Sequence, residues 1–508
     1  MKKFFKNFMA LGITAGALLA TPACTKLDEK VYSQIEPSNF FSSEKDFVAG
    51  VVPVYAALRS YQNNNQYYGI SQVTSDETVV PTRGGDWGDN GNWRFLHQHN
   101  WTAQHPFFND FWSGCYAGVF RANFAIEAIS KADDKFASKK QFLAEAKVLR
   151  AFFYYQLMDF FGGVPLYETA TLTAEQEQSP RKSRQEIFEF IENELKNSLP
   201  DLKEANELPS SRVSKGVANA LLAKLYLNAG VYVGTPRWQD AVNACDAVIN
   251  SGKYTLAANF FDNFSTNNET SPENIFTIGN LNQDGLGHNI SMMNLHYTQL
   301  PQGPWNGFCV VTEYYDSFDT LADARAKMFL KGFQTDFEGK PANDRQGKRL
   351  FFTVQIPSLT NAEERTGVRV LKFELDRQQV GGNARNDFPI LRFADVLLMK
   401  AEALNELRGP NAESIDLINR VRARAFNPAK PVSLGQFGTR EVLRAYLLRE
   451  RGYELGWEAH RRNDQIRMGT FTTGTWVHKA VSPATRTLFP IPQARLDTNP
   501  NLTQNPGY

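Results

Sequence analysis

Apolar residues recur at helical spacing over several long stretches of this chain, and these stretches end at residues that stop helices. One stretch at 107–129 places aromatic and aliphatic residues on one face, and a second amphipathic stretch covers 142–161. Gly162, Gly163 and Pro165 follow the second stretch, as expected at the C-terminus of a helix. The pattern predicts two long helices that pair antiparallel.

Two more helix pairs are predicted downstream. Helices are expected at 213–232 and 238–250, and alanine occupies their facing positions: Ala218, Ala220, Ala223, Ala241, Ala244 and Ala247. A third pair is expected at 393–407 and 412–425, followed by a last helix at 439–468. Repeating pairs of about 30 to 35 residues, with small residues where helices touch, resemble tetratricopeptide units.

Long segments rich in glycine, asparagine and aromatic residues separate these pairs. They cover residues 66–106, 259–307 and 332–388. Loops of this length in a compact protein are usually functional or disordered, and the many aromatic residues argue against disorder. We therefore expect a helical scaffold whose insertions form the working surface.

The first residues have the pattern of an export signal. Three lysines within the first six residues precede an apolar stretch at 8–20, and small residues lead to Cys24. The apolar stretch is too short to cross a bilayer, which needs about 20 apolar residues. We expect residues 1–23 to be a cleaved signal peptide, Cys24 to be acylated, and residues 24–508 to form a single domain. Thr21 departs from the usual lipoprotein pattern, and the same site would suit an ordinary signal peptidase that yields a secreted protein.

Composition narrows the function classes. Lys and Arg total 55 against 54 Asp and Glu, so the chain lacks the excess of basic residues that binding to nucleic acid requires. Apart from Cys24, the cysteines are Cys115, Cys245 and Cys309. An odd number so far apart is no disulfide framework, although one disulfide between two of them stays open.

Two aromatic clusters in the insertions are the candidate binding residues. In the first, glycines alternate with Arg83, Asp86, Trp87, Asn92 and Trp93. Flat apolar rings beside fixed hydrogen-bonding groups suit a pyranose ring and its hydroxyl groups. The tryptophans could equally plug the loop onto the helices, which we also expect of Trp101.

The second cluster contains Tyr297, Trp305 and Asn306, and turn-forming residues surround Trp305. We expect Trp305 on an exposed loop, where an indole ring favours a binding role.

Other groups point less clearly to chemistry. His97, His99 and His105 lie close in sequence, but neither a His-Glu-x-x-His motif nor a cysteine pair at zinc spacing accompanies them, so we expect no metal and no cofactor. The sequence contains no nucleophile elbow and no phosphate-binding loop. A pair of glycosidase acids stays open as a hypothesis, because the two carboxyl groups need to be close in space and not in sequence. The charged residues of 449–467 are expected to form ion pairs that fasten the last helix.

Several sequence motifs follow one another along the chain. They are PSNFF at 37–41, EAKVLRAFFYY at 145–155, DFFGGVPL at 159–166, LRFADVLLMKAEA at 391–403, INRVRAR at 418–424, ERGYELGWEAHR at 450–461, LFPIPQ at 488–493 and NPNLTQNPGY at 499–508. In this order they resemble the SusD/RagB family of outer-membrane lipoproteins from the Bacteroidetes. Each motif is weak alone, but their order along nearly the whole chain is specific.

The resemblance implies an all-α fold, in which tetratricopeptide-like helix pairs wrap a loop-rich irregular half with minor β structure. It also implies a non-catalytic protein, lipid-anchored at the cell surface, that captures oligo- or polysaccharide and delivers it to a SusC-like TonB-dependent transporter. Family binding surfaces are arcs of aromatic residues on the loop-rich half, which corresponds here to the clusters at 83–93 and 297–306. Three alternatives stay open: a peptide-binding lid of the same transporter, a surface glycosidase, and a structural scaffold.

Overall fold

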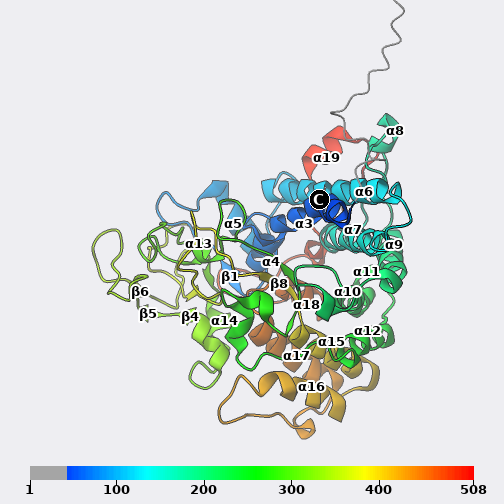
Figure 1. The fold of residues 1–508 in the computed structure, drawn as a ribbon. Helices are drawn as coiled ribbons and strands as arrows, with labels where there is room; N and C mark the ends of the chain where they lie inside the picture. Colours follow the sequence, from blue (N-terminus) through cyan, green and yellow to red (C-terminus); the bar gives the residue numbers. More distant parts are fainter. Residues whose placement is uncertain (1–42) are drawn as a thin grey trace, which may run out of the picture.

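The structure is a computed structural model and describes residues 43–508. The predicted signal peptide, Cys24 and the PSNFF motif lie outside these residues. Figure 1 shows a helical half that carries most of the long helices and a loop-rich half that extends to one side of it. The two halves meet around the short strand β8 (Phe388–Arg392) and the helix α4 (Tyr67–Val73).

The helical half is a stack of helix pairs. Its long members are α3 (Glu44–Ala57), α6 (Pro106–Ser130), α7 (Lys139–Phe161), α9 (Arg184–Ser198), α10 (Lys215–Leu227), α12 (Trp238–Asn250), α15 (Phe393–Arg408), α16 (Ala412–Arg422) and α17 (Arg440–Leu455). Each packs on the next in the series from α6 through α7 and α9 to α10, and from α10 through α12 and α15 to α16 (Figure 1). The predicted helix pairs are thereby confirmed.

Close approach between helices depends on small residues. A Cβ atom added to Gly118 of α6 would lie 2.4 Å from the ring of Phe153 on α7. Since real Cβ atoms do not come so close to a ring, glycine at this position sets the distance between the two helices. Gly162, with φ of 74°, ends α7 as the sequence predicts.

The structure differs from the prediction at three helices. The pattern missed α9, which begins at Ser183 with a capping box closed by Glu186. The expected helix at 213–232 divides into α10 and α11 (Ala229–Val233). The expected last helix divides into α17 and α18 (Arg461–Arg467), because Trp457 and Ala459 between them adopt left-handed φ angles of 64° and 66°.

The loop-rich half contains short strands in antiparallel pairs. β1 (Thr78–Val79) pairs with β3 (Cys309–Val310), β2 (Asn274–Ile278) with β8, β4 (Phe329–Leu330) with β7 (Arg369–Val370), and β5 (Gly332–Phe333) with β6 (Phe351–Phe352). Short helices lie between them, among which are α5 (Asn92–His97), α13 (Ile290–Asn294) and α14 (Thr312–Asp316). Helix pairs with minor β structure confirm the predicted all-α fold class.

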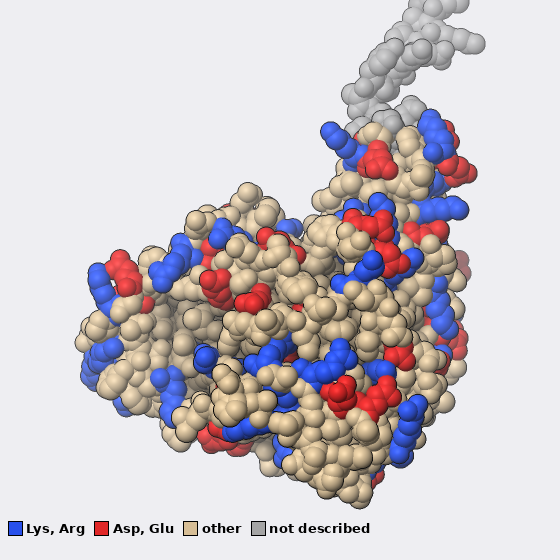
Figure 2. Space-filling view, turned by 60° about the horizontal axis from the view of Figure 1, so that its bottom comes forward, with Lys and Arg blue, Asp and Glu red and all other residues tan. Residues whose placement is uncertain are grey.

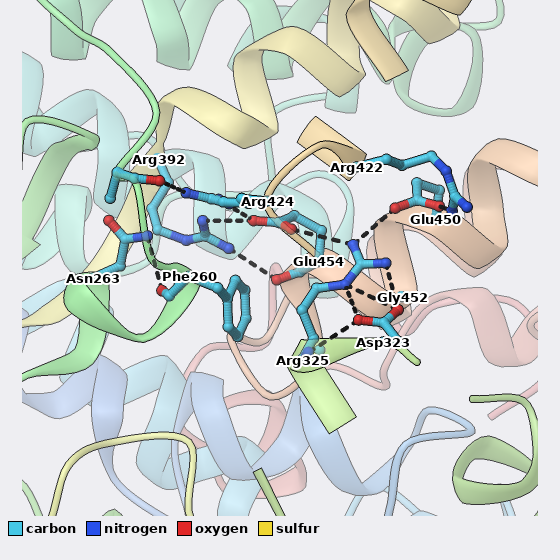
Figure 3. Close-up of polar contacts among 12 residues, drawn as sticks. Phe260, Asn263, Asp323, Arg325, Arg392, Arg422, Arg424, Glu450, Gly452 and Glu454 are labelled. Atoms are coloured by element: carbon cyan, nitrogen blue, oxygen red, sulfur yellow. Dashed lines mark hydrogen bonds and ion pairs between the residues drawn. The ribbon is translucent and has the colours of Figure 1, made fainter. Parts of the chain in front are cut away.

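Buried ion pairs tie the two halves together (Figure 3). Glu454 of α17 lies within 3.3 Å of the guanidinium groups of Arg325, Arg392 and Arg424, and all four side chains are buried or nearly so. Glu450 pairs with Arg325 and Arg422. The predicted role of 449–467 in ion pairing is confirmed. Asp464 pairs within this stretch with Arg451 and Arg467, and the partners of Glu450 and Glu454 come from other elements.

The three cysteines of the described chain are buried free thiols: Cys115, Cys245 and Cys309. The question of a disulfide among them is therefore settled in favour of small buried side chains. No helix within residues 43–508 is long and apolar enough to span a bilayer. On the face drawn in Figure 2, acidic and basic side chains are interspersed over much of the surface.

Candidate functional site

The two aromatic clusters predicted from the sequence lie against each other in the loop-rich half. The indole N–H of Trp87 donates to the carbonyl oxygen of Trp305 at 2.6 Å. The hydroxyl of Tyr297 donates to the carboxylate of Asp86, also at 2.6 Å. Two insertions separated by some two hundred residues in sequence thus form one surface.

Local backbone geometry makes this contact possible. Trp87 and Asn306 adopt left-handed φ angles of 59° and 52°, which turn each loop sharply. The ring of Trp87 packs over Gly307, where an added Cβ atom would lie 2.3 Å from the indole. Glycine at 307 is therefore required for Trp87 to reach the other loop.

Arg83 and Asn306 are buried behind this surface. The guanidinium of Arg83 donates to the main-chain carbonyls of Asn306 at 2.7 Å and Thr366 at 3.0 Å. The side-chain oxygen of Asn306 accepts from Arg369 at 2.7 Å, and its amide donates to the carbonyl of Glu364. Each of the two side chains is at most 1% exposed, so neither can contact a ligand as the sequence predicted. We assign to both the role of positioning the loops.

Trp93 is also a packing residue. It is 2% exposed, its indole N–H donates to Asp89 at 2.6 Å, and its ring contacts Phe107 and Phe308. The sequence left open whether Trp93 binds a ligand or packs its loop onto the helices, and this geometry supports packing. Trp101 is likewise buried, with its N–H on the hydroxyl of Tyr508.

The other predicted residues reach the surface. Trp305 is 37% exposed and is the most exposed of the eight tryptophans, all of which lie in the described part of the chain. Asp86, Trp87, Asn92 and Tyr297 are half-buried. Trp305 thus exposes its indole on the loop that Trp87 and Tyr297 join to Asp86. An exposed ring can stack on a flat ligand, and a phenol and a carboxylate can hydrogen-bond the edge of one.

Sequence reasoning missed Arg345 and Glu364, which come from the third insertion. The guanidinium of Arg345 lies 3.9 Å from the centre of the Tyr297 ring and donates to Asp86 at 3.0 Å and to Glu364 at 2.5 Å. The segment 332–388 was expected to belong to the working surface, but no aromatic cluster in the sequence pointed to these two residues. Only their contacts with residues distant in sequence identify them as part of the site.

His296 completes the polar set, and burial controls its protonation. Its Nε2 lies 3.0 Å from Glu364, yet burial lowers the pKa of His296 to about 4 against the opposing effect of that carboxylate. Burial tends to raise the pKa of Glu364, but the hydrogen bonds from Arg345 and His296 outweigh burial and lower it. Burial, then Asp86, raises the pKa of Tyr297. At neutral pH the site therefore offers a phenol, a neutral imidazole and a guanidinium between carboxylates.

The histidines near the first cluster make structural hydrogen bonds. His97 contacts the carbonyl oxygen of Val477 at 2.7 Å, and His99 lies between the carbonyl of Thr74 and the hydroxyl of Ser482. Between residues 43 and 508, no group of three or more His, Cys, Asp or Glu side chains is arranged to hold a metal ion.

A polar cavity of about 570 Å³ adjoins the surface. Its walls come from the third insertion and from the loop of Arg83: Arg83, Gly84, Asp344, Arg345, Gln346, Lys348, Arg349, Ala362, Glu363, Glu364 and Arg365. Arg345 and Glu364 belong to both the cavity and the aromatic surface, so a ligand on the surface can extend into the cavity.

Comparison with known proteins assigns the family. A family model described as "SusD family" matches residues 250–508, and one described as "Starch-binding associating with outer membrane" matches residues 27–227. The chain belongs to the SusD family. A SusD-like protein (P25) of Formosa agariphila is 25% identical over 95% of this chain and 96% of its own length. The starch-binding protein SusD of Bacteroides thetaiotaomicron is 26% identical over 72% of each chain.

Solved structures share the fold. A SusD superfamily protein from Parabacteroides distasonis superposes with a TM-score of 0.76 at 22% identity, over 92% of this chain and 100% of its own. A laminarin-binding SusD-like protein gives a TM-score of 0.73 at 24% identity, over 92% and 100%. Surface glycan-binding protein A from Bacteroides thetaiotaomicron, solved with laminarihexaose, gives 0.73 at 20% identity, over 91% and 99%.

Proposed function

We propose that this chain is a non-catalytic glycan-binding protein that captures oligo- or polysaccharide at the cell surface. The observation that carries the proposal is the exposed indole of Trp305 on a loop that contacts Trp87 and, through Tyr297, the paired groups of Asp86 and Arg345. A sugar ring stacks on an indole through its apolar face, while its hydroxyl groups need donors and acceptors at the edge. The names of the relatives, which bind starch, laminarin or surface glycan, support the same class of ligand.

The contacting residues in this proposal are Trp305, Tyr297, Asp86, Trp87 and Asn92. Trp305 supplies the stacking face, and the polar groups around it orient the sugar. Arg345 holds Tyr297 and Asp86 in place through its stacking and hydrogen bonds, which reduces the entropy lost on binding. A shallow, preformed surface of this kind suits an extended polysaccharide better than a small molecule.

The proposal extends to the location and partner of the protein. Residues 24–508 act as one domain, a lipid on Cys24 anchors it to the outer membrane with the binding surface facing outward, and it passes glycan to a SusC-like TonB-dependent transporter. Support comes from the leader before Cys24 and from the family description of association with the outer membrane. Co-purification of the protein with a transporter from detergent-solubilised outer membranes tests the partnership.

A peptide ligand or a glycosidase activity would require different features. Peptide capture favours an open strand edge or groove that pairs with a backbone, whereas this surface presents a ring face. A glycosidase needs an available acid and base, whereas Asp86 and Glu364 are both hydrogen-bonded to Arg345.

The deciding experiment exposes the purified protein to immobilised polysaccharides and to a peptide library, and assays the glycans for new reducing ends. We expect retention on glycan without release of reducing ends. Binding to peptides alone, or steady release of reducing ends, would overturn the proposal.

A further inference from the structure

The polar cavity lined by Arg345 and Glu364 has more cationic than acidic side chains. Five of its lining side chains are cationic and three are acidic, which leaves an excess of two positive charges. Asp86 at the rim reduces the excess to one. In a chain with nearly equal numbers of basic and acidic residues, this local excess marks the cavity as a place for negative charge.

The acidic groups of the cavity are already engaged. Glu364 pairs with Arg345, and Glu363 pairs with Arg365, both at 2.5 Å. Asp344 accepts the main-chain N–H groups of Gln346 and Lys348 at 2.9 Å, so its carboxylate is held within its own turn.

Three of the cations have no acidic partner. Among the described residues, no carboxylate lies within 4.0 Å of Arg83, Lys348 or Arg349 in an ion pair, whereas Arg345 and Arg365 are paired. Arg349 donates to the main-chain carbonyls of Gln334 and Ala342, and Lys348 is exposed. Lys348 and Arg349 are exposed and can contact an anion that enters from solvent, whereas Arg83 is buried.

Two buried guanidinium groups add positive potential from below. Arg83 is 1% exposed and Arg369 is fully buried, and both bond to neutral oxygens of the main chain or of Asn306. Burial, reinforced by the charge of Arg83, lowers the pKa of Arg369 to about 9. Buried charges normally have a charged partner, and the low local dielectric weakens their potential less than water would. The floor of the cavity is therefore positive before any ligand arrives.

We propose that this cavity binds an anionic group of the glycan, either the carboxylate of a uronic acid or a sulfate ester, next to the sugar that stacks on Trp305. The inference rests on the proposed glycan-binding function and adds a class of ligand to it. Lys348 contacts the anion at the mouth of the cavity together with Arg365, whose pair with Glu363 uses Nε and leaves its two terminal amino groups for the anion. Arg83 and Arg369 contribute through their charge alone. Guanidinium groups match the geometry of carboxylate and sulfate oxygens, which makes the site selective for the anion.

The test compares matched pairs of polysaccharides by isothermal titration with the full folded protein. The pairs are polyglucuronic acid with its carboxyl-reduced form and a sulfated galactan with its desulfated form, and laminarin is the neutral reference. We expect at least one acidic form to bind at least tenfold more tightly than its neutral counterpart, and this preference to shrink when NaCl rises from 50 to 500 mM. The pair that shows the preference identifies the carboxylate or the sulfate.

Two charge-matched variants locate the effect. The double variant Lys348→Gln/Arg365→Gln should lose at least fivefold in affinity for the acidic glycan and retain laminarin binding, if laminarin binds. The control Lys340→Gln/Arg377→Gln removes two exposed cations of the same insertion outside the cavity and should change neither. Equal affinity for acidic and neutral forms, or no effect of the cavity variant, would overturn this inference alone. Failure of every glycan to bind would overturn the proposed function as well.

Discussion

The indole N–H of Trp87 donates to the main-chain carbonyl of Trp305 at 2.6 Å, across 218 positions of sequence. The bond fixes the backbone of Trp305, the most exposed tryptophan of the protein. Trp87 in turn is held by its packing on Trp93 and Phe308. Besides its own proposed contact with the ligand, Trp87 therefore positions the loop from which Trp305 presents its ring.

Gly307→Ala should disturb this arrangement. The new Cβ atom would lie 2.3 Å from the Trp87 ring, so the ring or the loop must move, at a cost of about 1 to 3 kcal/mol. We expect a lower Tm and weaker glycan binding, measured by calorimetry. Gly85→Ala in the facing loop has open space around it and serves as the control. Equal behaviour of the two variants would show that Trp87 does not depend on Gly307.

Glu454→Gln should strongly destabilise the junction between the two halves. The carboxylate meets three arginines in the interior, and removal of one partner leaves buried charges uncompensated. We expect a loss of about 3 to 5 kcal/mol in the free energy of unfolding in urea. Glu338→Gln, which breaks an exposed pair with Lys340, should cost less than about 1 kcal/mol. A small effect at Glu454 would mean that the network adds little net stability.

Acid should destabilise the protein between pH 6.5 and 4. Burial lowers the pKa of six of the seven histidines to about 4, or about 3 for His99: His97, His99, His105, His288, His296 and His460. In the unfolded chain the histidines titrate at about pH 6.5, so below this pH the unfolded chain binds more protons than the folded chain. The free energy of unfolding therefore falls as pH falls. Three carboxyl groups oppose this trend, because burial raises the pKa of Glu77 to about 8, that of Asp387 to about 6, and that of Glu194 above its usual value.

The six histidines outnumber the three opposing carboxyl groups. The free energy of unfolding in urea should therefore fall by several kcal/mol from pH 7 to pH 5, at roughly 1.4 kcal/mol per pH unit for each net proton. His99→Gln should reduce the slope by about one proton. A flat profile over this range would contradict the burial of these imidazole groups.

Cys24→Ser should release the protein from membranes if the lipid is the anchor. The measurement is the distribution between membrane and soluble fractions in cells that lack the transporter partner. The wild-type protein should remain with membranes and the variant should not. Retention of the variant without a partner would refute the lipid anchor.

The helix pairs were predictable because local signals specify them. Apolar periodicity, alanines at facing positions and stops such as Gly162 act within a few residues of the helix that they define. The break after α17 was not predictable, since Trp457 and Ala459 adopt left-handed angles that their side chains do not favour. Tertiary contacts hold this turn, such as the hydrogen bond from the main-chain N–H of Trp457 to the buried carboxyl group of Glu77.

The aromatic clusters were predictable, but the roles of their members were not. Sequence composition placed Trp87 and Trp305 on working loops, and the structure brings those loops together. Burial of Arg83 and Asn306 depends on carbonyl groups far away in sequence, so a local motif could not separate them from surface residues. Arg345 was missed for the same reason, because its partners Asp86 and Tyr297 belong to other insertions.

The most direct test of the proposed function is the affinity of Trp305→Ala for a glycan that the wild-type protein binds, measured by isothermal titration. We expect at least a tenfold loss, about 1.4 kcal/mol, with no change in Tm. Phe124→Ala removes a ring on α6 that is 65% exposed and lies outside the site, and it should bind like the wild type. Undiminished affinity in Trp305→Ala would contradict the central claim that this indole is the glycan-stacking surface.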